Sequence, residues 1–400
     1  MSLTGTGGIE MRVEGTARDI TPFVRRFRWT ESLIAGGWSW SMSLATEQWS
    51  EWDTLLVGKE RPVVHFRLKS QEAGEEFSTE WKRAYIEDSR EAFRGATMLA
   101  HVRGADKRLE MRQKVRTRTH RAASVADVCR RIAGEYDLTP DLDDTTARRD
   151  RFQLREDDWG FMRRLLGETA LGSGRGDVFL WLDETTLRLH APELSALAAR
   201  RHDLAEVENR VDRVAIGYAG RRVDRLGGAS QRVVGFDLSA KAALVFDLGA
   251  NEAQTMPALA RRVPRDPADG LRVYALAEEG SAFVEDACRG SWGRTAPRYF
   301  SLRLETRPDL ALRPGAVIEV QANLDLRRES PFFGRFVVLE VQQHVERSAI
   351  RTVAICYRRE AFEGEVEPTG ASAAAGGTRD RYRADQPERT RTVVRAEVID

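Results

Sequence analysis

This sequence lacks the features that mark disulfide-stabilised, metal-binding or membrane-spanning proteins. Its three cysteines are scattered and form neither a disulfide framework nor a CxxC zinc motif. The six histidines show no HxH or HExxH spacing, and no stretch approaches the ~20 apolar residues of a membrane span. The first residues lack a basic region followed by an apolar core. We therefore expect no secretory signal, no membrane partner, and a protein made in the cytoplasm.

A strong charge of either sign is also absent. The 400 residues carry 63 basic and 62 acidic side chains, for a net charge of +1, and 42% of them are hydrophobic. This balance excludes collagen-like, coiled-coil and wholly disordered chains, and the length predicts about two to four compact units. A net charge this close to zero also argues against binding of nucleic acid by the overall charge of the protein, although a local basic surface is compatible with it. Arginines outnumber lysines 57 to six, which suits subunit borders and ion-pair networks, or reflects a bias of the source genome.

Residues 1–115 have the pattern of a β domain. Short segments rich in aromatic and β-branched residues are separated by Gly, Asp or Ser. From Trp38 to Leu44, apolar residues alternate strictly with serine, which predicts a half-buried strand. Strands of this length and spacing favour a barrel or a sandwich.

A change of period near Ser124 predicts a smaller α/β insert over residues 116–206. Ser124 can cap a helix, with Asp127 three residues later. A second helix follows, and Asp157 and Asp158 suit its cap and first turn because carboxylates favour the positive end of the helix dipole. A hairpin over residues 178–190 completes the insert. The buried stripe of the second helix is expected to contain Trp159, Met162, Leu165 and Leu166.

The rest of the chain repeats this plan and then changes character. We expect a second β domain over residues 207–250 and 298–362, interrupted by a helical insert over 251–297. Residues 363–400 begin with a Gly/Ala-rich flexible linker and end in a strand-like segment. That segment is either a mobile tail or an arm ordered only against a partner. The apolar residues of the candidate arm are Val393, Val394, Val398 and Ile399.

No residue pattern in the chain predicts catalysis, a cofactor or a metal ion. Adjacent carboxylates, such as Asp157 with Asp158 and Asp143 with Asp144, could supply an acid and a base, but a helix cap explains the first pair without chemistry. The Gly-rich segments match no nucleotide-binding motif. The basic run from Arg112 to Arg118 lacks interleaved aromatics, so it indicates a solvated or interface surface, with a DNA-channel surface as the alternative. We expect that the protein is not an enzyme.

The central part of the chain resembles a known family. The resemblance rests on the helix at residues 124–133, the segment at 152–166, a Gly-rich loop and the hairpin from Phe179 to Leu189. This succession is similar to that of phage tail baseplate hub proteins, the group that includes the phage late-control protein D and the hub portion of type VI secretion spike proteins. The matching structural motif consists of Asp158, Trp159, Phe161 and Leu165, together with Arg163 and Arg164.

The resemblance implies an α+β, mainly β fold with two tail-tube-like β-barrel domains and smaller α/β inserts. It implies a homotrimeric ring that adapts the sixfold tail tube of a phage or a phage-derived contractile injection system to a threefold spike. After Phe362 there is no long run of strands for a needle, so the spike is expected to be a separate protein.

Further implied partners are the tail tube protein, the baseplate wedge proteins and the tape-measure protein, with DNA or cargo passing only transiently through the channel. The expected location is the virion tail or injection particle, assembled in the bacterial cytoplasm. Two alternatives remain open, a tail-associated cell-wall hydrolase and a carbohydrate-binding β protein.

Overall fold

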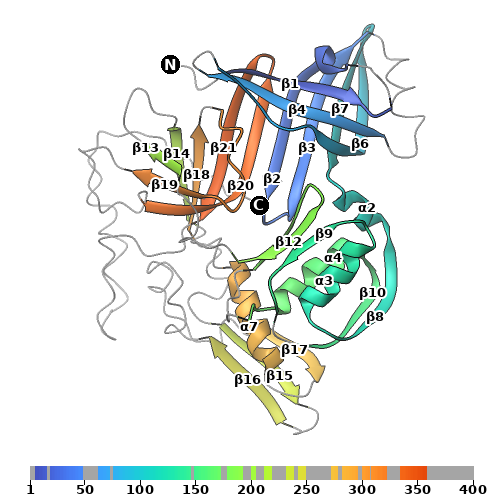
Figure 1. Ribbon diagram of the computed structural model, residues 1–400, viewed down its shortest axis with the longest axis vertical. Helices are drawn as coiled ribbons and strands as arrows, with labels where there is room; N and C mark the ends of the chain where they lie inside the picture. The colour runs from blue at the N-terminus through green and yellow to red at the C-terminus, as the bar shows by residue number, and fades with distance from the viewer. Residues whose placement is uncertain are drawn as a thin grey trace.

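The protein is seen here in a computed structural model (Figure 1) that describes residues 5–15, 19–47, 62–72, 75–145, 148–172, 178–191, 200–203, 211–218, 231–237, 242–248, 272–277, 282–295, 300–306, 308–321 and 334–357. Every statement about structure below concerns these residues. They form a mainly β fold with a few short helices, in agreement with the predicted class. The candidate arm at residues 393–399 lies outside them.

Most of the strands belong to one large sheet whose pairings return to their start. The pairings run from β20 through β2, β3, β7, β6, β4 and β1 to β21, and β21 pairs again with β20. All of these pairs are antiparallel, and the short β5 is added to the edge of β4. The members are β1 (Gly5–Val13), β2 (Val24–Ser32), β3 (Gly37–Thr46), β4 (Val63–Glu72), β5 (Glu75–Ser78), β6 (Lys82–Arg94), β7 (Thr97–Ala105), β20 (Gly334–Glu346) and β21 (Ala349–Tyr357), with a 3-10 turn at Thr21–Phe23.

The alternation in the sequence explains the core of this first β region. In β3 the apolar residues Trp38, Trp40, Met42 and Leu44 are buried, while Ser39 is exposed, as predicted. Their side chains belong to an aromatic-rich core to which residues of β1, β2, β3, β4 and β7 contribute. Within it, the Phe66 ring packs edge-on against Trp29 and Trp38 and lies tilted against Phe27.

The hairpin β20–β21 connects this region to a second group of strands. The first half of β20 pairs with β19 and its second half with β2. Likewise β21 pairs with β18 over most of its length and with β1 at its start. The additional strands are β13 (Arg200–Asp203), β14 (Val211–Tyr218), β18 (Phe300–Thr306) and β19 (Val317–Gln321). Before β19, Gly315 takes a φ of +87°, in keeping with the turn expected at the Pro-Gly pair.

The α/β insert consists of helices, a two-stranded ribbon and a three-stranded sheet that share one core. Ser124 and Asp127 form the capping box predicted for the first helix, and Asp157 caps the second. Two strands that the sequence analysis did not predict, β8 and β10, form the ribbon, and a third, β9, pairs in parallel with β12. The elements are α2 (Arg108–Gln113), β8 (Val115–Ala123), α3 (Val125–Gly134), β9 (Thr139–Leu142), β10 (Arg149–Asp157), α4 (Asp158–Leu165), a 3-10 turn at Leu166–Glu168, β11 (Phe179–Asp183) and β12 (Thr186–His190).

A separate three-stranded sheet contains β15 (Gln231–Asp237), β16 (Ala242–Leu248) and β17 (Arg272–Ala277), and α7 (Ala282–Thr295) contacts β15 and β16. The helix α7 confirms the expected helix at 281–292. Strand β17, however, lies where a helical insert was expected. Its six residues include Val273 and Tyr274, which favour extended backbone, and a run this short gains little from helix formation. The other expected helix, at 252–262, lies outside the described residues.

Across the described ranges, no helix combines the length and the apolar character that a membrane crossing requires.

Candidate functional site

The buried carboxylate of Asp158 is the centre of a polar network in the insert. Its side chain begins α4 and is fully buried. Arg118 Nη2 and Gln153 Nε2 donate to its Oδ1 at 2.7 and 2.9 Å, and the Tyr136 hydroxyl donates to its Oδ2 at 2.7 Å. Arg116 Nε lies 3.3 Å from the same Oδ2. The carboxylate therefore has a partner on both oxygens, as a buried charge requires.

Glu135 completes this network at the end of α3. Its two carboxylate oxygens lie 2.6 Å from Nη1 of Arg116 and Nη1 of Arg118. Two arginines thus face two carboxylates, and the pairs join β8 to the ends of both helices. Burial, followed by the hydrogen bond to Asp158, raises the pKa of the Tyr136 hydroxyl, which keeps it a donor. Two of the four cations in the basic run from Arg112 to Arg118 therefore pair with carboxylates of the insert.

The adjacent residue Asp157 has a different role. Its Oδ1 accepts a hydrogen bond of 2.7 Å from the Gly160 amide, which is the cap predicted for this helix. The pair Asp157–Asp158 is thus one helix cap and one buried anchor.

One member of the other adjacent pair, Asp143, lies beside a histidine on the hairpin together with Asp141. Asp143 Oδ1 is 3.0 Å from His190 Nδ1, and Asp141 Oδ1 is 3.1 Å from His190 Nε2. Because carboxylates occupy both ring nitrogens, neither nitrogen is free to act on a substrate.

Trp159, the second residue of the motif, faces the first β region. It is 3% exposed and lies against Gly36 in the turn between β2 and β3. A Cβ on Gly36 would come within 2.5 Å of Trp159 Cζ2 and 2.6 Å of the Leu180 carbonyl, and Gly36 has a φ of +78°. The Leu182 amide donates to the Gly36 carbonyl at 2.9 Å. The insert and the first sheet therefore meet at a contact so close that only glycine fits.

The remaining motif residues fill the core of the insert. Phe161 is completely buried and stacks on His120, with ring centroids 5.5 Å apart, and Leu165 is 2% exposed. Burial, with a smaller contribution from Arg118 and Arg131, lowers the pKa of His120 to about 4. His120 is consequently neutral near pH 7, which suits its apolar neighbour.

A buried ion pair that the sequence analysis missed connects α2 to the turn between β2 and β3. Arg108 Nε and Asp106 Oδ1 are 2.6 Å apart, and both side chains are 3% exposed or less. Arg108 also donates to the carbonyls of Ala35 and Trp38 at 2.6 Å, while Asp106 accepts from the Trp38 amide at 2.8 Å. The guanidinium carbon lies 5.5 Å from the centre of the Trp159 ring. No sequence motif indicates that this pair is buried, because the backbone groups that it binds, at Ala35 and Trp38, lie about 70 residues earlier in the chain.

A second charged cluster lies where the first sheet, the hairpin of the insert and the loop before β19 come together. Lys82 pairs with Glu184, and Arg313 Nε lies 3.6 Å from Glu31 Oε2. Both cations lie over the Trp29 ring, at 5.7 and 5.4 Å from its centre. Burial raises the pKa of Glu31 to about 7. The Arg108–Asp106 pair, the charged cluster around Trp29 and the Gly36 contact connect the insert to the first β region. We call this set of contacts the junction.

The described residues hold no group of three or more His, Cys, Asp or Glu side chains placed to bind a metal ion. Cys129, Cys288 and Cys356 are buried and form no disulfide. Burial raises the pKa of the Cys129 thiol to about 12 and also raises that of Cys356, so neither resembles a reactive thiolate. Two further charged pairs of the sequence, the carboxylates Glu278–Glu279 and the basic residues Arg221–Arg222, lie outside the described residues.

The fold defined by these elements is that of phage tail proteins and type VI secretion spike-related proteins. A tail protein from Neisseria meningitidis is similar with a TM-score of 0.60 and 11% identity, over 88% of this chain and 97% of its own. A 43 kDa tail protein of prophage MuSo2 from Shewanella oneidensis is similar with a TM-score of 0.60 and 12% identity, over 88% and 99% of the two chains.

An Escherichia coli type VI secretion component, described as structurally similar to the T4 tail proteins gp27 and gp5, matches with a TM-score of 0.51 and 13% identity, over 90% and 79% of the two chains. No family model matches the sequence, and no curated protein matches it. The resemblance inferred from residues 124–189 is thus confirmed at the level of the fold, by similarities that extend over 88% to 90% of the chain.

Proposed function

We propose that this protein is a structural baseplate hub of a phage tail or a phage-derived contractile injection system. The observation that supports this best is the fold, which it shares over most of its length with tail proteins and with a type VI secretion component. The junction gives a physical reason for a structural role, because buried ion pairs and a glycine contact hold the insert in one orientation. The carboxylates and the histidine described above likewise form contacts within the protein: Asp157 caps a helix, and His190 lies between two carboxylates.

In this proposal the ring of strands from β20 to β21 is a first tube-like β-barrel, and β13, β14, β18 and β19 belong to a second. The shared hairpin β20–β21 would hold the two at a constant angle, since each of its strands pairs with both groups. Three copies would then supply six tube-like units in one ring, and so adapt a sixfold tube to a threefold spike.

The partners proposed are therefore two further copies, a separate spike protein, the tail tube protein and the surrounding baseplate wedge proteins, with the tape-measure protein in the channel. The candidate arm containing Val393 and Ile399 is proposed to contact the spike. DNA or cargo would pass only transiently.

The ring is tested by the mass of the assembly in solution. Sedimentation velocity of the full chain, with and without spike and tube proteins, should give a species of three times the 45.1 kDa chain. A stable monomer in both conditions would contradict the proposal. Incubation with purified peptidoglycan is the complementary control, since cleavage lost on substitution of a carboxylate would support a cell-wall hydrolase instead.

A further inference from the structure

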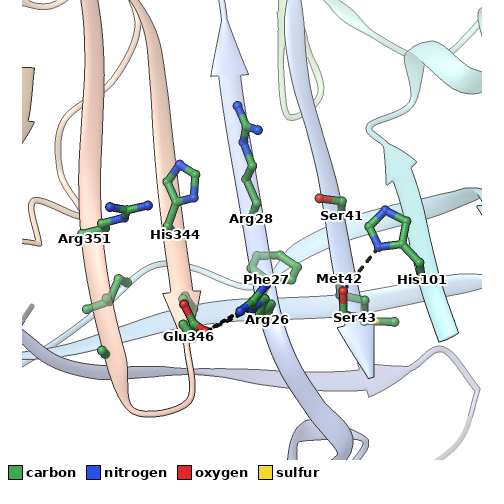
Figure 2. Close-up of a pocket in the computed structure, with 13 residues that line it drawn as sticks. Arg26, Phe27, Arg28, Ser41, Met42, Ser43, His101, His344, Glu346 and Arg351 are labelled. Atoms are coloured by element: carbon green, nitrogen blue, oxygen red, sulfur yellow. Dashed lines mark hydrogen bonds and ion pairs between the residues drawn. The ribbon is translucent and has the colours of Figure 1, made fainter. Parts of the chain in front are cut away.

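A basic hollow crosses the outer face of the first β region (Figure 2). It has a volume of about 580 Å³ and is lined by residues of five strands, β7, β3, β2, β20 and β21. Arginine, histidine and serine side chains dominate its surface, and Glu346 is the single carboxylate among its lining residues. The polar lining residues are Arg26, Arg28, Ser41, Ser43, His101, His344, Glu346 and Arg351.

Two arginines of this basic hollow form no ion pair within the described residues. Glu346 is taken by Arg26, at 2.9 Å from Nη2, whereas no carboxylate of the described residues pairs with Arg28 or Arg351. In the register of the sheet His344 lies between them, opposite Arg28 on one side and Arg351 on the other. Their backbones are therefore two strand spacings apart, about 10 Å. Burial and these two arginines lower the pKa of His344 to about 4, so the histidine adds no charge near pH 7.

The same β region carries a smaller hollow of the opposite sign. This acidic hollow has a volume of about 280 Å³ between β6 and α2, and Glu87, Asp88 and Glu110 are among its lining residues. No basic side chain lines it, although Arg90 and Arg103 each come within 3.3 Å of Asp88. Within the described residues the two other carboxylates, Glu87 and Glu110, form no ion pair, and Glu110 shares a hydrogen bond with the Tyr85 hydroxyl.

The two hollows occupy different parts of the ring of strands. The basic hollow is lined by residues from β21 to β7, and the acidic hollow begins on β6, the neighbour of β7. The two arginines lie further away, because β2, which carries Arg28, is separated from β6 by β3 and β7. One molecule therefore presents complementary charges on two separate patches. Such a molecule associates with its copies head to tail, and this type of contact forms a closed ring when the rotation between copies closes.

We propose that the basic hollow of one copy receives the acidic surface of the next copy, with Arg28 and Arg351 pairing with Glu87 and Glu110 across the interface. The proposal rests on the trimeric ring proposed above, and it assigns the two faces that form that ring. A nucleic acid is the less suitable occupant because the aromatic side chain lining the hollow, Phe27, is 2% exposed and cannot stack on a base.

The test is a charge reversal followed by a charge exchange. We compare the wild type, Arg28→Glu with Arg351→Glu, Glu87→Arg with Glu110→Arg, and the variant that combines all four changes. Each double variant should associate at least tenfold more weakly in sedimentation equilibrium, because like charges then face each other, and the fourfold variant should regain association. In the wild type, raising NaCl from 50 to 500 mM should weaken association by a similar factor.

The matched control reverses two exposed arginines of the ribbon, Arg121→Glu with Arg155→Glu, and should leave association unchanged. Unchanged thermal unfolding midpoints show that a variant is folded, and the rescue in the fourfold variant cannot arise from misfolding.

Two results would overturn the assignment of these faces. One is a folded Arg28→Glu, Arg351→Glu variant that remains trimeric, which would leave the proposed hub function standing. The other is loss of binding to a labelled single-stranded oligonucleotide in that variant with self-association unchanged, which would assign the hollow to nucleic acid. A wild type that stays monomeric at low salt and high concentration would instead contradict the ring itself.

Discussion

The buried carboxylate of Glu31 should make the stability of the protein fall as the pH rises. Its side chain is 13% exposed, and burial is the main cause of a pKa near 7, against an ordinary value of 4.5. Asp183 and Glu184 act in the same direction, while Arg313 and Lys82 oppose it and offset burial only in part. A pKa raised in the folded state means stability that is present below the unfolded-state pKa and lost as the pH rises through the folded-state pKa.

The change to test is Glu31→Gln, which keeps the shape of the neutral acid and removes the titration. A difference of about 2.5 pKa units, at 1.36 kcal/mol each, gives a loss of about 2 to 3 kcal/mol in the wild type between pH 5 and pH 8. The variant should match the wild type within about 1 kcal/mol at pH 5 and exceed it by about 3 kcal/mol at pH 8.

Urea denaturation monitored by tryptophan fluorescence measures the free energy of unfolding at each pH, and Trp29 is a suitable probe because Arg313, the partner of Glu31, lies over its ring. The control is Glu80→Gln, at an exposed glutamate, which should change the free energy of unfolding equally at both pH values. A Glu31→Gln variant that is less stable than the wild type at pH 8 would refute the reasoning, because it would show that an ionised Glu31 stabilises the fold through Arg313.

Three substitutions test the packing around the motif. Trp159→Ala should lower the free energy of unfolding by about 3 to 5 kcal/mol through a cavity, and near-wild-type thermal stability would show that the side chain is not core. Asp158→Ala should cost about 3 to 5 kcal/mol in urea denaturation, against about 1 kcal/mol for loss of the cap in Asp157→Ala. The larger cost is expected because the buried donors of Tyr136 and Gln153 lose this acceptor, and because Arg116 and Arg118 keep only Glu135 as a carboxylate partner. Equal costs would mean that the network contributes nothing beyond the cap. Gly36→Ala should cost at least 2 kcal/mol more than Gly95→Ala, because both glycines have positive φ but nothing lies within 4 Å of a Cβ on Gly95; similar thermal midpoints would remove the close contact from the account.

Local patterns in the sequence were sufficient to predict many of the elements. The alternation from Trp38 to Leu44 gave a strand with the correct buried face, and the Ser124 and Asp157 caps gave the starts of two helices. These signals depend on neighbours within a few residues, which is why they can be read directly. Strands β8 and β9 carry too little alternation of apolar and polar residues to be recognised, since β8 is rich in arginine and the four-residue β9 contains Pro140.

The contacts that form the junction could not be predicted in the same way. Arg108 and Asp106 look like surface charges in the sequence, and they are buried only because the turn before Trp38 folds over them. Gly36 resembles any turn glycine until Trp159, more than a hundred residues later, is placed against it. The pairing of β20 with both β2 and β19 is likewise a long-range property of the sheet. Of the motif, the burial of Trp159 was predictable from helical periodicity, but its neighbours were not.

The most direct test of the structural role is electron microscopy of the assembled particle with this chain located in the density. We predict three copies in a ring at the distal end of the tail tube, between the tube and a threefold spike, with the first β regions arranged around the channel. Density for the chain outside that ring, for example as a peripheral fibre or as a single copy, would contradict the proposed hub.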